Sequence, residues 1–135
     1  MESRRVNLFG TSGIRGLAST EITPEFGERL GLALSKWLGK NKVVTLGRDN
    51  RPKAAAVSQA VKKGLAAGGV KVRDLGMMPT PELSFHLVRV KADAGIMVTG
   101  SHLPIEFLGI IPMNGDGSGI FGQAGEEITK IFYES

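Results

Sequence analysis

Helix and strand patterns alternate along this chain between residues 20 and 100. Three segments carry apolar residues at helical spacing, and each is followed by a short apolar stretch that is typical of a strand. The predicted helices cover residues 23–39, 53–67 and 80–90, and the predicted strands cover residues 42–47, 70–76 and 94–100. Strands joined by helices of this length form parallel pairs with the helices on the faces of the sheet. The sequence therefore predicts an α/β fold with a largely parallel sheet.

Capping residues mark where two of these helices begin. Thr23 is predicted as the N-cap of the first helix, with Pro24 at its first position and Gly39 as its stop. Thr80 and Pro81 repeat the pattern, which predicts Thr80 as the N-cap of the third helix.

The C-terminal third of the chain has shorter patterns. Residues 109–113 are predicted as an extended segment that Pro112 would confine to a sheet edge, because proline has no N–H to donate. Residues 126–134 are predicted as a closing helix. Between them lies the sequence NGDGSG, in which Asp116 invites a calcium-loop interpretation. The ligand spacing and the terminal glutamate of such a loop are missing, so a turn is favoured.

Composition and charge limit the classes of function. The 135 residues, of which 41% are hydrophobic and 22% charged, match one globular domain, residues 1–135. The net charge of +4 comes from scattered basic residues, and only 6% of the residues are aromatic. We therefore expect no nucleic-acid partner, because such grooves interleave basic and aromatic side chains. The weak positive charge favours small anionic ligands.

The chain contains no cysteine. This excludes disulfides, thiolate zinc sites and cysteine nucleophiles, and it is compatible with a reducing cytoplasm. The N-terminus lacks the apolar core of a signal peptide, and no stretch approaches 18 apolar residues. We therefore expect a soluble, cytoplasmic protein with no membrane partner.

The sequence FGTSGIRG, residues 9–16, is the first candidate binding segment. Its glycines allow backbone N–H groups to approach an anion closely, and Thr11, Ser12 and Arg15 add side-chain donors. This chemistry favours a phosphate or a carboxylate, with an ordinary glycine-rich turn as the alternative. The segment is not a Walker loop, because no lysine follows its last glycine.

The sequence TGSHLP, residues 99–104, places a hydroxyl just beyond the most apolar predicted strand. Ligands of open α/β sheets bind beyond the carboxyl ends of the strands, where Ser101 falls. His102 is not predicted as the base for Ser101, because adjacent residues of an extended chain point apart. His86 lies within the predicted third helix and is expected to be half-buried packing. A hydrolase that uses Ser101 is therefore the weakest hypothesis.

The sequence GRDNR, residues 47–51, forms a polar turn after a predicted strand. Asp49 is a candidate metal ligand. The favoured interpretation is a turn in which Asp49 caps the following segment and pairs with Arg48 or Arg51.

Five segments occur in an order that resembles the first domain of the phosphohexomutases, the family of phosphoglucomutase, phosphomannomutase and phosphoglucosamine mutase. They are FGTSGIRG, GRDNR, GGVKVRDLGMMPTPEL, ADAGIMVTGSH and GII, and they span nearly the whole chain. The resemblance implies a three-layer α/β/α domain with a mixed, mostly parallel sheet. It also implies that this domain is the first of four, so that domains 2–4 belong to the same enzyme or come from another chain.

The resemblance also implies roles for individual residues. Ser101 matches the serine that exchanges a phosphoryl group with a hexose or hexosamine phosphate through a bisphosphate. His102 matches the histidine beside that serine, and Arg15 matches an arginine near the substrate and the phosphoserine. Mg²⁺ binds the phosphoserine together with three aspartates of a later domain, so Ser101 would serve as a metal ligand only through its phosphoryl group. The chain alone is therefore expected to be inactive.

The sequence departs from the family after His102. The family typically has SHNPPEYNGIK where this chain has SHLPIEFLGII. Leu103 and Leu108 replace two asparagines, and Ile111 replaces a lysine that is often assigned a general acid/base role. Loss of that cation removes charge neutralisation beside a phosphate. The alternative is therefore a non-catalytic module of mutase descent that binds a sugar phosphate or a protein, with an apolar surface formed by Leu103, Ile105, Phe107, Leu108 and Ile111.

Overall fold

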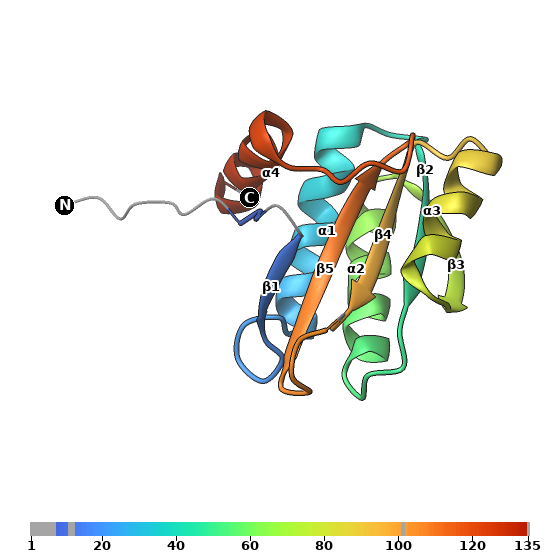
Figure 1. Cartoon of the computed structure of the whole chain (residues 1–135). Helices are drawn as coiled ribbons and strands as arrows, with labels where there is room; N and C mark the ends of the chain where they lie inside the picture. Colours follow the sequence, from blue (N-terminus) through green and yellow to red (C-terminus); the bar gives the residue numbers. More distant parts are fainter. Residues whose placement is uncertain (1–7, 11–12, 101, 135) are drawn as a thin grey trace.

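The computed structural model describes residues 8–10, 13–100 and 102–134, which form one five-stranded sheet and four helices (Figure 1). The strands are β1 (Ile14–Leu17), β2 (Val43–Arg48), β3 (Lys71–Met77), β4 (Ala94–Thr99) and β5 (Phe107–Asn114). The helices are α1 (Pro24–Leu38), α2 (Ala54–Ala67), α3 (Thr80–Arg89) and α4 (Gly122–Glu134). Within the described residues, no helix is long and apolar enough to cross a membrane.

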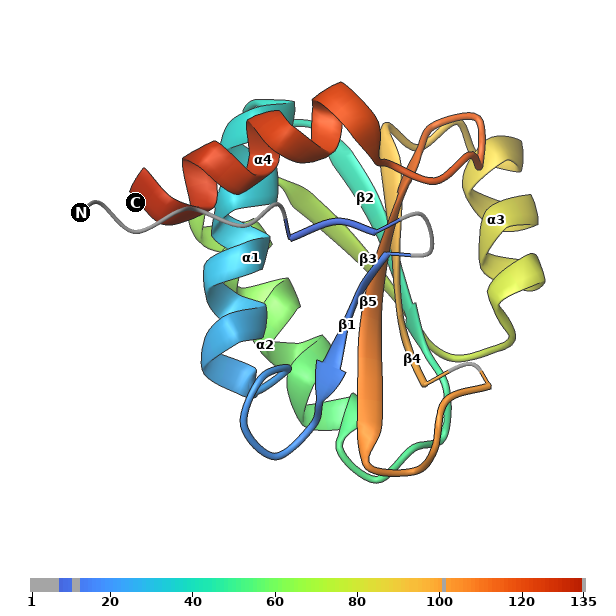
Figure 2. The ribbon, with the colours of Figure 1, turned by 60° about the vertical axis from the view of Figure 1, so that its left-hand side comes forward.

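The sheet is mixed, with the strand order β1-β5-β4-β2-β3. β2 pairs in parallel with β3 and with β4, whereas β5 is antiparallel to its neighbours β4 and β1. Four strands therefore point one way and β5 points the other way. Figure 2 shows α1 and α2 on one face of the sheet and α3 on the opposite face. The predicted three-layer α/β/α fold with a mixed, mostly parallel sheet is confirmed.

Two apolar clusters hold the layers together, one on each face of the sheet. The larger cluster joins the sheet to α1, α2 and α4 and includes Leu30, Val61 and Ile110, all fully buried. The smaller cluster lies between α3 and the sheet and includes Leu83 and Met97. Burying one such side chain stabilises the fold by about 1.5–3 kcal/mol, so both faces contribute.

β5 lies inside the sheet, so the prediction that Pro112 would confine this segment to an edge is wrong. β1 pairs only with residues 107–110, so among the described residues no strand of the sheet continues along that side of the second half of β5. The Pro112 carbonyl accepts from the Ile120 N–H at 3.0 Å, which means that it points away from β4. In a strand, the nitrogen and the carbonyl of one residue point to the same side. An N–H at position 112 would therefore also point away from β4, so the proline removes no hydrogen bond between β5 and β4.

The glycine-rich segment contains a strand that the sequence analysis did not predict. Residues 14–17 form β1, and they alternate between buried and exposed along its length. Four residues are too few for this period of two to stand out in the sequence. The closing helix is also longer than predicted, because α4 begins at Gly122 rather than at residue 126.

The two predicted threonine caps have different outcomes. The Thr23 hydroxyl accepts from the Phe26 N–H at 3.2 Å, which confirms Thr23 as the N-cap of α1. Thr80 is instead the first residue of α3, and the N-cap position belongs to Pro79, whose side chain makes no capping bond. Pro79 has an extended backbone, so the chain turns into the helix one residue earlier than predicted.

Candidate functional site

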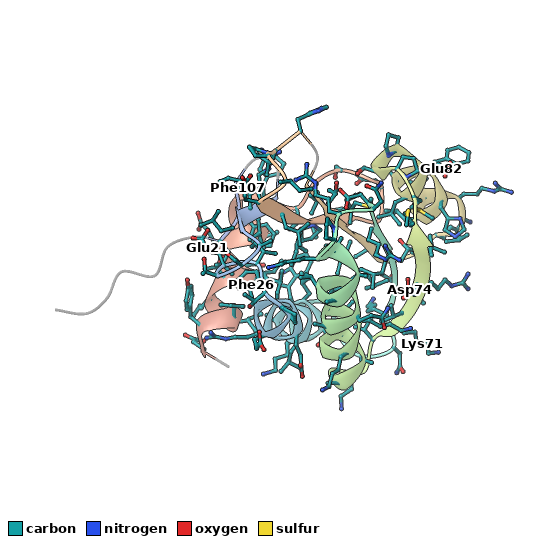
Figure 3. All side chains as sticks on the ribbon, turned by 90° about the horizontal axis from the view of Figure 1, so that it is seen from below. Glu21, Phe26, Lys71, Asp74, Glu82 and Phe107 are labelled. Atoms are coloured by element: carbon teal, nitrogen blue, oxygen red, sulfur yellow. The ribbon has the colours of Figure 1, made fainter. Side chains whose placement is uncertain are left out.

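The carboxyl ends of β1, β2 and β4 meet at one edge of the sheet, which we call the carboxyl edge. These strands point the same way, so the segments that follow them, residues 18–22, 49–53 and 100–106, leave the sheet together at the bottom of Figure 1. Figure 3 views the molecule from below, with Phe107 toward β1 and Asp74 on the opposite side. Open α/β sheets bind their ligands at this edge.

Ser101 is the second residue after β4 in the sequence. Ser101, Thr11 and Ser12 lie outside the described residues, so the roles predicted for these three hydroxyl groups stay predictions. Gly100 is buried, whereas His102 is exposed.

Arg15 lies in β1, the strand that the sequence analysis did not predict. The strand register places Arg15 beside Gly109 of β5, and Gly109 beside Thr99 of β4. Residues paired in this way share one face of the sheet. Met97, two residues before Thr99, packs in the cluster under α3, so the row formed by Arg15, Gly109 and Thr99 lies on the α3 face.

Gly109 lies between Arg15 and Thr99 in this row across three strands. Neighbouring strands lie about 4.8 Å apart, so the Cα atoms of Arg15 and Thr99 are separated by about 10 Å. A Cβ atom at Gly109 would lie 3.4 Å from Arg15 Cγ, which means that the Arg15 side chain runs over this glycine. Arg15 is exposed. Arg15 therefore lies in the same cross-strand row as Thr99, the last residue of β4.

The turn after β2 is bonded to the end of β4 through Asp49. Asp49 Oδ2 accepts from the Thr99 hydroxyl at 2.7 Å and from the Gly100 N–H at 2.8 Å. Asp49 Oδ1 accepts from the Arg51 N–H at 3.0 Å, and Arg51 Nε lies 3.9 Å from Oδ2. The predicted turn with an Asp49–Arg51 pair is confirmed. Both carboxylate oxygens are used within the protein, which disfavours Asp49 as a metal ligand.

The bonds from Asp49 to β4 were missed by the sequence analysis. Thr99 and Gly100 supply the donors, and both lie about 50 residues from Asp49 along the chain. The signal that was available is a threonine–glycine pair at the end of one strand and an aspartate just after another. It becomes informative only once the two strands are known to be neighbours.

The other candidate residues lie away from the carboxyl edge. Asp116 belongs to the turn after β5, and the end of β5 pairs with the start of β4. The Ser118 hydroxyl and N–H donate to Asp116 Oδ1 at 2.6 and 2.9 Å and hold the pKa of Asp116 below its usual value. The predicted turn is confirmed, and His86 is half-buried in α3 as predicted. Among the described residues, no three His, Asp or Glu side chains are grouped to hold a metal ion.

The apolar residues that replace the polar loop of the family point in different directions. Leu108 is fully buried in the cluster under α1 and α2, whereas Ile111 packs against the cluster under α3. Leu103 and Phe107 are half-buried, and Ile105 is 64% exposed. These five residues therefore do not form the continuous apolar surface that was expected for a binding module.

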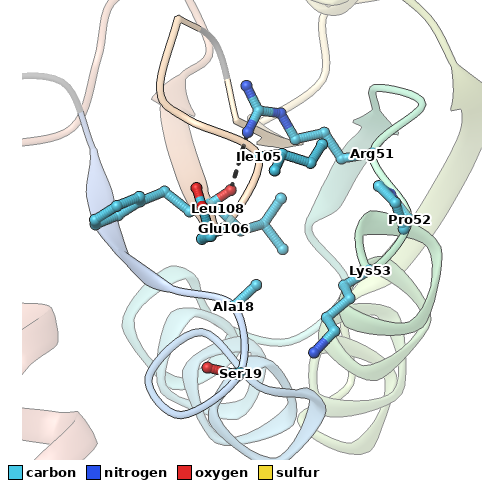
Figure 4. A pocket seen from close by; sticks show the side chains of 9 residues that line it. Ala18, Ser19, Arg51, Pro52, Lys53, Ile105, Glu106 and Leu108 are labelled. Atoms are coloured by element: carbon cyan, nitrogen blue, oxygen red, sulfur yellow. Dashed lines mark hydrogen bonds between the residues drawn. The ribbon is translucent and has the colours of Figure 1, made fainter.

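A pocket of about 230 Å³ lies next to the loop after β4 (Figure 4). It extends from Ala18, just after β1, to Lys53 at the start of α2, with Leu108 in its apolar wall. Neither Arg15 nor His102 lines it.

Comparisons with known proteins cover nearly the whole chain. Residues 6–135 match the family model described as phosphoglucomutase/phosphomannomutase, alpha/beta/alpha domain I. A probable phosphoglucosamine mutase of Methanosphaera stadtmanae is 42% identical over 128 residues, which are 94% of this chain and 28% of that protein. A phosphoglucosamine/phosphogalactosamine mutase of Sulfurisphaera tokodaii is 37% identical over 126 residues, 93% of this chain and 28% of that protein.

The fold comparison points in the same direction. The crystal structure of a putative phosphomannomutase from Thermus thermophilus superposes with a TM-score of 0.86 and 34% sequence identity, covering 96% of this chain and 30% of that one. The chain thus spans between a quarter and a third of the length of these three proteins.

Proposed function

Since this chain belongs to the phosphoglucomutase/phosphomannomutase family and matches its alpha/beta/alpha domain I, we propose that it is the phosphoserine-bearing first domain of a mutase. The enzyme would interconvert the 1- and 6-phosphates of a hexose or hexosamine. The observation that carries this proposal is the row of Arg15, Gly109 and Thr99. In this row, Arg15 lies on the same face as Thr99, which comes two residues before Ser101 in the sequence, and a cation on this face would neutralise the charge of a transferred phosphoryl group.

Ser101 is the proposed carrier of the phosphoryl group. In the first half of the reaction, the P–O bond to Ser101 Oγ breaks and a P–O bond to a sugar hydroxyl forms, while the hydroxyl proton ends on the serine oxygen. The second half reverses these changes with the other phosphate of the bisphosphate. Such transfers depend on in-line alignment and on neutralising the charge of the phosphoryl oxygens.

Arg15 is the cation that we assign to the phosphoryl group. Ile111 stands where the family has a lysine, and it lies on the same face as Arg15, because Arg15 pairs with Gly109, two residues earlier in β5. A guanidinium group in this place offers two parallel N–H donors to phosphate oxygens. His102, which is exposed at the same edge, is assigned as a second donor. Thr11 and Ser12 are assigned as further donors to the phosphate.

The rest of the active site is assigned to protein outside this chain. The described residues form no metal-binding group, so we propose that Mg²⁺ takes its ligands from later domains and from a phosphoryl group on Ser101. The chain spans only 28% of its curated relatives. We therefore propose that the other domains supply the sugar contacts as well, and that residues 1–135 alone do not turn over a substrate.

A domain exchange tests this proposal. We define the chimaera as the Methanosphaera stadtmanae relative in which this chain replaces the matching 128 residues. The chimaera is assayed for interconversion of glucosamine 1- and 6-phosphates. We expect interconversion by the chimaera, and none above background by its Ser101→Ala variant or by the isolated chain. An active Ser101→Ala chimaera, or turnover by the isolated chain, would contradict the proposal.

A non-catalytic module of mutase descent is the second candidate, and Ile111 in place of the family's lysine favours it. It predicts a chimaera that binds the sugar phosphate but does not convert it. In that case Ser101→Ala would leave binding unchanged, because no phosphoryl group would be transferred to the serine.

A further inference from the structure

Arg51 binds the loop after β4, which contains Ser101 in its sequence. Arg51 Nη1 donates to the carbonyl groups of Pro104 at 2.6 Å and of Phe107 at 3.2 Å, and Nη2 donates to the carbonyl of Leu103. Figure 4 marks the bond to Phe107 at the rim of the pocket. The Arg51 side chain is only 14% exposed. One guanidinium group therefore ties together three carbonyl oxygens of the same loop.

The three carbonyl groups belong to two consecutive turns. The Leu103 N–H donates to the Gly100 carbonyl at 2.8 Å, and the Phe107 N–H donates to the Pro104 carbonyl at 2.9 Å. Arg51 donates at the junction between these turns and so fixes one turn relative to the other. A planar guanidinium presents its donors in a fixed fork, whereas a lysine ammonium presents them around one atom.

The same short turn also holds the start of the loop. Asp49 accepts from the Gly100 N–H at 2.8 Å. A Cβ atom on Gly100 would lie 1.9 Å from Arg51 Nε, so that only glycine fits against the guanidinium group. The turn after β2 therefore fixes the loop at its start through Asp49 and at its end through Arg51.

These contacts argue against Arg51 as a direct phosphate ligand. Its charge is paired with Asp49, both Nη atoms donate to carbonyl groups, and most of its side chain is buried. Arg15, which is exposed on the α3 face, has the access that a phosphate ligand needs. The geometry of Arg51 fits a role in holding the loop.

We infer that Arg51 is a positioning residue for phosphoryl transfer. By binding the carbonyl groups of Leu103, Pro104 and Phe107, it holds the described part of the loop, and we expect this hold to determine how the Ser101 hydroxyl is presented to the substrate. This inference rests on the proposed function of Ser101. A displacement of about 1 Å in a reacting group lowers the rate about 100-fold, so the hold on the loop has a large effect on turnover.

Arg51→Lys is the variant that tests this inference, because it keeps the charge and the aliphatic stem but loses the fork. Hydrogen exchange of the Leu103 and Phe107 amides is measured in the full chain, and kcat and KM are measured in the chimaera. We expect these amides to exchange at least about tenfold faster, since a hydrogen bond to a charged group is worth about that factor. We expect kcat to fall about 100-fold with KM almost unchanged.

Two further variants separate positioning from general stability. Arg48→Lys is the matched control, because Arg48 lies in the same segment but donates to the Asp49 carbonyl, at 3.2 Å. It is expected to leave both readouts within about twofold of the parent. Gly100→Ala keeps the arginine at position 51, but the added methyl group would displace the guanidinium group. This variant is therefore expected to reproduce the effects of Arg51→Lys. Gly100 does not have a positive φ, so its backbone accepts alanine.

The outcomes distinguish this inference from the proposed function. Unchanged amide exchange in Arg51→Lys would overturn the inference, and so would faster exchange with an unchanged kcat. Equal losses of kcat in Arg51→Lys and Arg48→Lys would also overturn it, because they would indicate a general structural effect. An inactive parent chimaera would refute the proposed function, and amide exchange in the full chain would still decide whether Arg51 holds the loop.

Discussion

Asp49→Ala is expected to lower the free energy of unfolding by about 3 kcal/mol. The substitution leaves the Thr99 hydroxyl and the Gly100 N–H without their acceptor, and it removes the charge paired with Arg51. The Asp49 side chain is 23% exposed, so water can replace part of the lost hydrogen bonding. The expected loss of stability therefore lies at the lower end of the range for breaking a buried ion pair. Urea unfolding followed by the fluorescence of Trp37, the single tryptophan, measures the change.

The same experiment separates a structural role of Asp49 from a role as metal ligand. Asp116→Ala is the matched control, because Asp116 also accepts bonds within a turn but is exposed, and we expect a much smaller change. A chelator should leave the unfolding free energy of the parent chain unchanged. If the loss in Asp49→Ala appears only in the presence of Mg²⁺, Asp49 is a metal ligand and the structural account of this turn is wrong.

Gly64→Ala is expected to destabilise the chain by about 2 kcal/mol, although alanine favours a helix by about 1 kcal/mol over glycine. A Cβ atom at Gly64 would lie 2.0 Å from the Glu28 carbonyl oxygen and 2.8 Å from the Leu32 nitrogen. Both are backbone atoms of α1, so no side-chain rotation relieves the contact and the two helices must separate. The free-energy cost of separating α1 and α2 therefore exceeds the gain in helix propensity.

Gly119→Ala provides the control for this prediction. Apart from Gly119 itself and its two neighbours in the chain, no atom of the described residues lies within 4 Å of the added methyl group, and the residue does not have a positive φ. We expect a change within about 0.5 kcal/mol. Thermal or urea unfolding of both variants gives the comparison, and a neutral or stabilised Gly64→Ala variant would show that α1 and α2 do not pack as closely as described.

Most of the fold could be predicted because its signals are local. The first helix has a cap, a stop and an apolar face within one segment of sequence, and β4 is a continuous apolar run. β1 was missed because its alternation covers only four residues and its partner, β5, is about 90 residues away. The wrong prediction of an edge strand at Pro112 has a similar origin, since Pro112 lies in the half of β5 that β1 does not reach.

The candidate site was predictable in part. The order of the five segments indicated the family, which the comparisons confirm. The roles that it implied for Arg15 and Ser101 stay predictions. The contacts of Asp49 and Arg51 with the loop after β4 were not predictable, because they depend on β2 lying next to β4 in the sheet. Strand order is a property of the whole fold, and no local pattern around residue 50 contains it.

The central claim is that the carboxyl edge presents Ser101 to a phosphoryl donor. The most direct test is the intact mass of the chimaera after incubation with a hexosamine bisphosphate and Mg²⁺. The account predicts the addition of one phosphoryl group to the parent chimaera and none to its Ser101→Ala variant. An unmodified parent, or a phosphoryl group that persists in Ser101→Ala, would contradict it.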